Sequence, residues 1–523
     1  MAAEVFKNYY EEDTVEFTAV LDRLLAAVDY NTLLIELFAK NMKILARNGK
    51  KLADMLTALE LNGLFLEGKS FMVATQYTGN SHKAPGTTDD ILGALYEHGK
   101  LSAGEQRYLV TIALMPATNH KFDIIVKLVA DDEGKAGRIL YELTQKGWLN
   151  GTDSGYRMSQ VIQHVTLNKY KESLQDFGLP IVKILCGIMG NDIDHLTENY
   201  YHNALPYSYI VKFLAQKLRA SPYLSYLCSH AGDFYLHLGD FTDSIHLYEL
   251  DAIFCRDLLG QDRNNIDHKN RLAISYTKLG DVNEKMGDLN KALEFYNKRS
   301  DLIEQLLQTN PLDMQFICGL AISYGKLGGI YEKMWKLNKA QEFYTQVTRL
   351  FVQLHDTYPM DLAFTNGLAT SYSRLGGVYE EMGDFDKALS FYNKRNDLGK
   401  QLHDANPKDV AFTNGMANSY ERLGGIYEKM EDLDQALEYF KKRNDLGKQL
   451  HDTNPMDVDF NNGLAISYSR LGFLLSKMDN AVDAKQNYLL AQGMWQEMVA
   501  VFPDFYEVGQ NLGWVNKQLA QME

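Results

Sequence analysis

The segment Leu368–Tyr392, LATSYSRLGGVYEEMGDFDKALSFY, recurs in related forms along the second half of the chain. The copies start 48 residues apart, at Leu224, Leu272, Leu320, Leu368, Met416 and Leu464, with a shorter segment from Leu512. Self-similarity at a fixed period of this size is typical of repeat architectures. We therefore expect residues 224–523 to form an array of six repeats plus a C-terminal helix, in which each repeat contacts its neighbours.

Each copy predicts two helices. The first carries an apolar stripe at positions i, i+3, i+4 and i+7, formed by Tyr372, Leu375, Gly376 and Tyr379. It should end near Gly383, and the second helix should run to Pro407, because proline stops a helix. Gly376 and Gly377 lie inside the first helix, where glycine costs about 1 kcal/mol relative to alanine. Because the pair recurs in other copies, we expect a packing reason, namely close approach of a neighbouring helix.

The copies resemble the tetratricopeptide repeat, whose pattern is an aromatic residue, x2-Leu-Gly-x2-Tyr, then alanine and an aromatic residue. Three copies carry this pattern at Tyr324, Leu327, Gly328, Tyr331, Ala340 and Tyr344; at Tyr372, Leu375, Gly376, Tyr379, Ala388 and Tyr392; and at Tyr420, Leu423, Gly424, Tyr427, Ala436 and Phe440. The period of 48 exceeds the family's 34, so both helices should be longer. The resemblance implies a right-handed superhelix of helix hairpins with a concave, peptide-binding groove.

The first 223 residues predict a different, mainly helical organisation. Residues 1–86 are expected to form a helical subdomain, and 166–223 a helical linker. Between them, residues 87–165 contain three helical segments and then WLNGTDSGYRMS, whose Asn150-Gly151 and Ser154-Gly155 pairs indicate a hairpin. Three helices followed by a two-stranded hairpin is the order of a winged helix. The fold class is therefore mainly α: a helical bundle and a winged helix followed by a solenoid.

The order of elements in residues 1–220 resembles the C-terminal half of the NB-ARC module of STAND-class signalling NTPases. The family's nucleotide-binding subdomain precedes this region, so the resemblance implies an NTPase module encoded upstream or supplied by a partner. Two features depart from the family pattern. Asn31-Thr32 stands where the family has Gly-x-Pro, and Ser159 stands where it has a phosphate-sensing histidine. These departures argue against nucleotide binding by this chain, and no cofactor is expected.

One string fits the phosphate-loop pattern letter for letter, GLFLEGKS at Gly63–Ser70. A working phosphate loop needs a preceding strand, small loop residues and a following helix. Here a helical pattern precedes the string, bulky residues fill it and an extended pattern follows. We interpret it as a chance match or a structural turn, not as an ATP site using Lys69.

Composition limits the remaining functions. The net charge is −15 and the pI is near 5.4, which disfavours broad binding to nucleic acid or anionic membranes. The N-terminus has no signal-peptide pattern, and the most apolar run, Leu179–Gly190, is too short to span a bilayer. A cytoplasmic protein is expected, and as this chain a monomer.

No catalytic or metal-binding pattern stands out. The four cysteines form no CxxC pair, and HExxH, G-x-S-x-G and EF-hand strings are absent from the sequence. Two helical sets, His195/Glu198/His202 and His230/Asp233/His237, could in principle supply metal ligands, but packing or solvated histidines explain them better. We predict no enzyme, no catalytic residue and no metal.

In the tetratricopeptide family the first helix of each pair lines the groove, so the resemblance implies a row of partner-binding residues. They are Asn366, Thr370, Ser373, Arg374, Glu380, Asn414, Arg422, Glu428, Asn462 and Arg470. Gly329, Gly377 and Gly425 would open the groove floor to an incoming backbone. These positions could equally be solvated polar side chains without a ligand, and the sequence leaves both readings open.

The sequence thus predicts a non-catalytic protein–protein interaction scaffold or sensor arm that binds a protein or peptide in the groove. The alternative is a transcriptional regulator that binds DNA through the winged helix. Its recognition helix, Gly134–Gly147, carries Lys135, Arg138 and Lys146. Three acidic residues, Asp131–Glu133, come just before this helix and oppose phosphate contacts.

Overall fold

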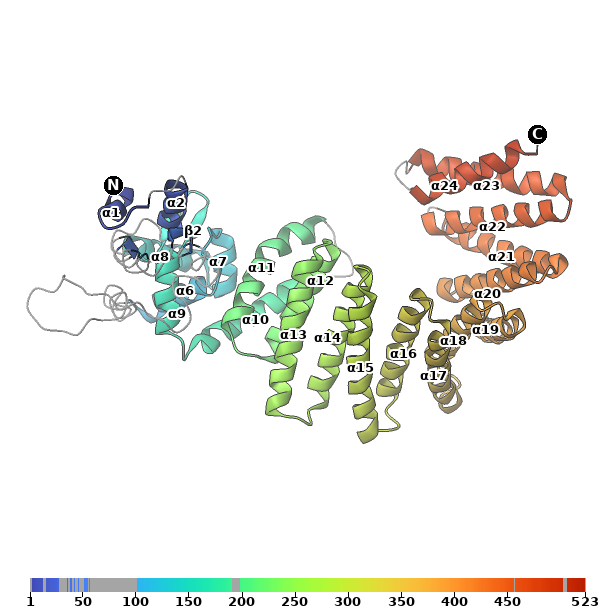
Figure 1. The fold of residues 1–523 in the computed structure, drawn as a ribbon, viewed down its shortest axis with the longest axis horizontal. Coiled ribbons are helices and arrows are strands. Elements are labelled where there is room, and N and C mark those ends of the chain that lie inside the picture. Colours follow the sequence, from blue (N-terminus) through green and yellow to red (C-terminus); the bar gives the residue numbers. More distant parts are fainter. Residues whose placement is uncertain are drawn as a thin grey trace, which may run out of the picture. The chain divides into compact units, whose positions relative to one another are not determined.

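The computed structural model describes residues 2–12, 16–27, scattered positions between 35 and 56, 101–190, 198–455, 457–501 and 506–522. The chain divides into two compact units, Met1–His268 and Lys269–Glu523. The boundary falls in the first turn of helix α14 (Ile266–Lys285). Figure 1 shows helices along both units and one short hairpin.

Among its described residues, the N-terminal unit has two short helices, α1 and α2, and then a compact helical body. Its elements are α1 (Ala2–Lys7), α2 (Phe17–Ala27), α6 (Ala103–Ala113), α7 (Phe122–Val129), α8 (Glu133–Gln145), β1 (Asn150–Thr152), β2 (Gly155–Arg157), α9 (Gln160–Lys169), α10 (Leu174–Met189), α11 (Glu198–Lys217), α12 (Pro222–His237) and α13 (Phe241–Gln261). The strands pair antiparallel, with Asn150 opposite Arg157. Three helices followed by a hairpin is the order that the sequence predicts within 87–165, and the winged-helix assignment remains an interpretation.

One continuous apolar core joins helices α6 to α13 of this unit. It runs from Leu101, just before α6, and Tyr108 of α6 to Leu214 of α11 and Phe254 of α13. A second core packs α1 and α2 against Val161 and Val165 of α9. The α12–α13 hairpin carries the first copy of the repeat, yet its side chains belong to the core of the N-terminal unit. The expected boundaries at 86, 165 and 223 therefore stay predictions.

The C-terminal unit is a succession of helix hairpins. After α14 come α15 (Leu289–Thr309), α16 (Met314–Lys333), α17 (Leu337–Thr357), α18 (Leu362–Glu381), α19 (Phe385–Ala405), α20 (Val410–Lys429), α21 (Leu433–Thr453), α22 (Val458–Lys477), α23 (Ala481–Val501) and α24 (Tyr506–Ala520). Figure 1 shows α15 to α24 packed side by side in chain order. The even-numbered helices are the first of each pair, and the odd-numbered ones the second. The predicted fold class, mainly α with a solenoid of helix hairpins, is confirmed.

The recurring glycine of the first helix has the predicted packing role. A Cβ atom on Gly376 would lie 2.5 Å from Cε1 of Tyr392, the aromatic residue of the second helix. The same contact recurs in every copy, at Gly232–Tyr248, Gly280–Tyr296, Gly328–Tyr344, Gly424–Phe440 and Gly472–Tyr488. Glycine at this position thus lets the two helices of a hairpin approach closely. Its neighbour Gly377 is different, since a Cβ there would meet only the Tyr392 hydroxyl, at 3.9 Å.

Turns between the two helices follow a common design. A residue with positive φ ends the turn, and an aspartate then caps the second helix, as Gly383 and Asp384 do before α19. Such aspartates accept hydrogen bonds from backbone N–H groups that the first helical turn leaves unpaired. The turn before α17 departs from this design. It contains Trp335 at φ 56° and then Lys336, which forms no side-chain cap.

No helix in the described part of the chain is long and apolar enough to cross a membrane.

Candidate functional site

The first helices of neighbouring repeats are joined by a row of ion pairs near their C-terminal ends, here called the ladder. Lys333 Nζ lies 2.7 Å from Glu284 Oε1, Lys429 Nζ 2.7 Å from Glu380 Oε1, and Lys477 Nζ 2.6 Å from Glu428 Oε1. Tyrosines of the second helices reinforce it: the Tyr296, Tyr344 and Tyr392 hydroxyls donate to Glu284, Glu332 and Glu380. The carboxylates of these glutamates therefore already have lysine or tyrosine partners within the protein.

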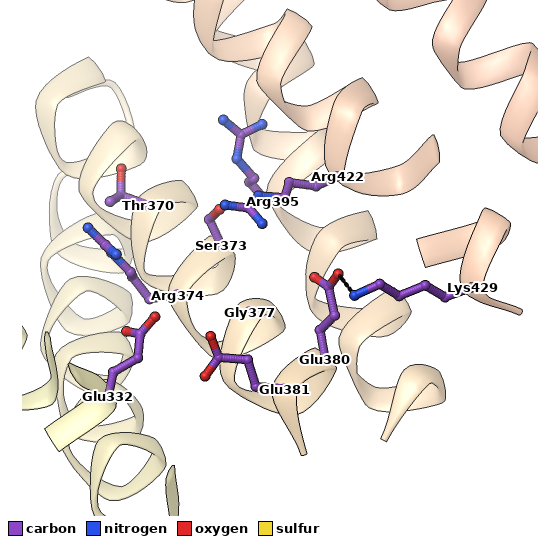
Figure 2. A pocket seen from close by; sticks show the side chains of 10 residues that line it. All are labelled: Glu332, Thr370, Ser373, Arg374, Gly377, Glu380, Glu381, Arg395, Arg422 and Lys429. Carbon is purple, nitrogen blue, oxygen red and sulfur yellow. Dashed lines mark hydrogen bonds and ion pairs between the residues drawn. The ribbon is translucent and has the colours of Figure 1, made fainter. Parts of the chain in front are cut away.

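A cavity of about 470 Å³ opens beside the ladder (Figure 2). Helices α16, α18, α19 and α20 line it with Glu332, Thr370, Ser373, Arg374, Gly377, Glu380, Glu381, Arg395, Arg422 and Lys429. Figure 2 shows Arg395 and Arg422 on one side and the Glu332 and Glu381 carboxylates on the other. The cavity therefore presents opposite charges to an entering chain.

Arg395 is the most unusual residue of this cavity. Burial, together with the neighbouring Arg422 guanidinium, lowers the pKa of Arg395 to about 10. Its counterparts donate from Nη1 to a backbone carbonyl, Arg299 to Gly319 at 2.7 Å and Arg443 to Gly463 at 2.8 Å. Among the described residues, Nη1 of Arg395 is buried and has no hydrogen-bond partner. A buried donor without an acceptor is costly, so an acidic group brought close would be favoured.

Two further cavities adjoin the first, because they share lining residues with it. One, of about 720 Å³, lies toward α22 and adds Asn418, Glu421, Gly425, Glu428 and Arg470. The other, of about 740 Å³, lies toward α14 and shares Glu332, Thr370, Arg374 and Glu381 with the first. Its remaining lining is more apolar and includes Ile322, Trp335, Val347 and Phe351. The three cavities form a row along the first helices.

The structure brings most of the predicted partner-binding residues to this row. Thr370, Ser373, Arg374, Glu380, Arg422, Glu428 and Arg470 line its cavities. Asn366 and Asn414 are exposed but do not line them. Asn462 has a structural contact, since its Oδ1 accepts a hydrogen bond of 2.8 Å from Nε1 of Trp495. Binding by any of these residues stays a prediction.

Sequence reasoning missed four charged residues of the first cavity: Glu332, Glu381, Arg395 and Lys429. Arg395 belongs to a second helix, and the family resemblance directs attention to first helices. A signal was nevertheless present. Aligning the copies puts lysine at 333, 429 and 477 but glutamate at 381, and that break marks the cavity.

The other candidate sites have weaker support. The Gly63–Ser70 string and the His195 set lie outside the described residues or have undescribed side chains. In the second set, Nδ1 of His237 contacts the Asp233 carbonyl at 2.8 Å, within its own helix. No group of three potential metal ligands occurs among the described residues. The Ser159 side chain caps α9 by accepting from the Ile162 N–H.

The predicted DNA-recognition helix, α8, has little free positive charge. Lys135 Nζ lies 2.9 Å from Asp131, and Lys146 pairs with the buried Glu105. Arg138 is the one remaining member of the predicted basic set. Two of the three cations are thus neutralised locally, which disfavours phosphate contacts.

Comparison with protein families matches the tetratricopeptide repeat at residues 273–299, 369–394 and 417–442. Comparison with curated proteins gave no match. Solved structures of low similarity include BtubC from P. vanneervenii, at 19% identity over 49% of this chain and 92% of that one, TM-score 0.40. A STAND protein with a tetratricopeptide repeat sensor from Pyrococcus horikoshii has 14% identity over 84% of this chain and 66% of that one, TM-score 0.36.

The matched segments coincide with repeats that the geometry defines independently. Each spans the glycine of a first helix and the aromatic residue of the second that packs on it, as Gly376 and Tyr392 do. The spacing, the hairpin packing and the family match therefore agree. The second half of this chain contains tetratricopeptide repeats.

Proposed function

We propose that the repeat array is a non-catalytic interaction scaffold that binds a protein partner through an extended peptide segment. The segment would lie in the row of cavities along α16, α18, α20 and α22. The observation that carries this proposal is the adjoining cavities, whose lining is rich in charged side chains of both signs. A polar peptide matches such a lining, because charged interfaces gain specificity from complementary potentials.

Several features of the cavities support a ligand over plain solvation. Arg395 has a buried donor without an acceptor, and Arg422 lies close enough to lower the pKa of Arg395. Gly377 and Gly425 line the cavities, and a Cβ at Gly425 would meet nothing within 4 Å. Glycine there leaves room for an approaching backbone without being needed for packing.

Site-specific photocrosslinking in the source cells tests this proposal. A photoreactive residue replaces Ser373 in the cavity or, as the matched control, the exposed Lys394 of α19, which lies outside the cavities. We expect a discrete crosslinked partner from position 373 and none of the same mass from position 394. Arg374→Glu and Arg422→Glu should each reduce that product at least about fivefold.

The proposal fails if no partner crosslinks at 373, or if the same partner appears at both positions. It also fails if the two arginine variants, folded by circular dichroism, leave the crosslinked product unchanged.

The resemblance of residues 1–220 to a STAND module extends the proposal. In this version, binding of the partner in the array is transmitted to an NTPase module encoded upstream or supplied in trans. A blot of the source cells with an antibody against the repeats separates the two cases. A band well above 59.5 kDa would favour an upstream module, and a band at 59.5 kDa an adaptor working in trans.

A further inference from the structure

The ladder has one missing rung. The glutamates of the ladder recur at 284, 332, 380 and 428, and lysines 333, 429 and 477 reach three of them from the next repeat. Glu332 should be reached from position 381, where this chain has Glu381 instead of lysine. Figure 2 shows the two carboxylates turned toward the same part of the cavity. Two carboxylates thus lie at this rung, whereas each of the three other rungs has one carboxylate and one ammonium group.

The electrostatics of Glu381 agree with this arrangement. Its pKa is raised by burial and by the Glu332 and Glu380 carboxylates, although Lys429 and Arg422 oppose the shift. Arg374 lines the same cavity, and Figure 2 marks no ion pair between it and Glu332 or Glu381 among the described residues. Glu380 is already paired with Lys429. The space between Glu332 and Glu381, here called the gap, therefore lacks the lysine that the repeat pattern supplies at the other rungs.

A second departure from the repeat pattern, Trp335, lies at the same cavity as Glu332 and Glu381. Trp335 stands in the turn position that Gly239, Gly287 and Gly383 occupy in three copies and Glu431 and Asp479 in two others, and it shares their positive φ, at 56°. An aromatic residue in this conformation is strained. Its side chain is 75% exposed, yet it lines the 740 Å³ cavity together with Glu332 and Glu381. The turn geometry does not require a tryptophan here, because glycine, glutamate and aspartate take the same conformation in the other copies.

A third departure shapes the floor of this cavity. Val347 stands where three other copies have Arg299, Arg395 and Arg443, so this repeat lacks the internal arginine. Exposed Ile322 adds to the apolar lining. The cavity thus combines two carboxylates that have no ladder lysine beside them, an exposed indole and an apolar floor. That combination fits the apolar stem and charged end of a long basic side chain.

We propose that the gap between Glu332 and Glu381 binds the lysine or arginine side chain of a partner's peptide segment, with Trp335 packing against its stem. The incoming cation takes the place of the missing ladder lysine. A divalent metal is a poorer fit, because calcium takes six to eight oxygen ligands and this gap offers two carboxylates. This inference rests on the proposed peptide-binding function and names the residue that the array selects.

A peptide library tests it with the full chain. One position is fixed in turn as lysine, arginine, norleucine, glutamine or glutamate, and the other positions are randomised. We expect wild-type protein to prefer lysine or arginine over norleucine by about tenfold at that position. Glu381→Lys rebuilds the rung to Glu332 and should abolish the preference without lowering the melting temperature. Glu381→Gln, which keeps the size of the side chain, should weaken it.

The matched control is Glu342→Lys, which makes the same charge change on an exposed position of α17 outside the cavities. It should keep the basic preference. Trp335→Gly restores the common turn and should weaken lysine and arginine binding several-fold while leaving the array folded. Peptide binding without a basic preference, or a preference that survives in Glu381→Lys, overturns this inference and leaves the proposed function standing. Absence of binding to every pool overturns both.

Discussion

Two neighbouring glycines of α18, Gly376 and Gly377, have different structural roles. Gly376 is buried against the Tyr392 ring, whereas Gly377 lines the cavity with free space around it. Both weaken the helix by propensity, but only Gly376 is required by packing. The difference explains why the first glycine recurs in all six copies while the second does not.

Gly376→Ala and Gly377→Ala form a matched pair of variants. The Cβ of the first lies 2.5 Å from Tyr392 Cε1, so the ring or helix must shift, at about 1–3 kcal/mol of unfolding free energy. The second should gain up to about 1 kcal/mol from helix propensity. Urea denaturation of both variants measures the difference. Equal effects would contradict the packing role.

Lys336 is a residue at which the fold has not been optimised for stability. It precedes α17 without capping it, whereas Asp384 accepts from the Lys387 N–H and Asp432 from the Gln435 N–H. Lys336→Asp should therefore stabilise the array by about 1 kcal/mol. Thermal unfolding monitored by circular dichroism provides the test. Lys336→Asn separates the cap from the change in charge, and a loss of stability in both would refute the argument.

The ladder belongs to the scale of secondary-structure elements, since each rung joins the ends of two first helices. Burial alone would raise the pKa of Glu380, but the hydrogen bonds from Lys429 and Tyr392 outweigh it and lower that pKa below its usual 4.5. Glu284 behaves in the same way with Lys333 and Tyr296. The ionised carboxylates therefore stabilise the folded array.

This predicts an acid-sensitive array. A carboxylate with a lowered pKa adds stability above its unfolded pKa, near 4.5, and loses it as the pH falls through the folded value. Lys429 is half exposed, so Lys429→Met should cost only about 0.5–1 kcal/mol at pH 7. The cost should shrink as the pH falls below about 4.5. Unfolding curves between pH 3 and 7 test this, and a cost that grows toward low pH would contradict it.

At the scale of the whole array, neighbouring repeats are joined by near-identical apolar clusters. Ala340 and Tyr344 of α17 pack on Leu375 and Val378 of α18, and Ala436 and Phe440 of α21 pack on Leu471 and Leu474 of α22. In such arrays stability is close to a sum of repeat and interface contributions. Position along the array should therefore decide what an interface mutation does.

Leu375→Ala and Leu471→Ala remove the same side chain from two of these interfaces. Both leucines are buried, so each change should cost about 2–5 kcal/mol locally. The central variant should uncouple the repeats on its two sides, and the C-terminal one should loosen α22 to α24 alone. Hydrogen exchange followed by mass spectrometry maps the change. Identical protection losses in both variants would show that the array unfolds as a single unit.

The repeat could be predicted from the amino-acid sequence alone. Its 48-residue period, the glycine-aromatic pair and the turn residues are local or periodic features, and helices depend strongly on such features. Both helix boundaries near Gly383 and Pro407 were predictable for that reason. So was the row of polar residues on the first helices, because one helical face repeats at a fixed spacing.

The residues that share a cavity could not be predicted in this way, because they are set by the packing of helices that lie far apart in the sequence. Arg395 comes from a second helix, and Glu332 and Glu381 from different repeats, so their meeting depends on how hairpins stack. The assignment of the first repeat copy to the core of the N-terminal unit also depended on long-range contacts. Periodicity specifies the face of a helix, but packing between helices specifies its neighbours, and charges, pKa values and binding sites arise from neighbours.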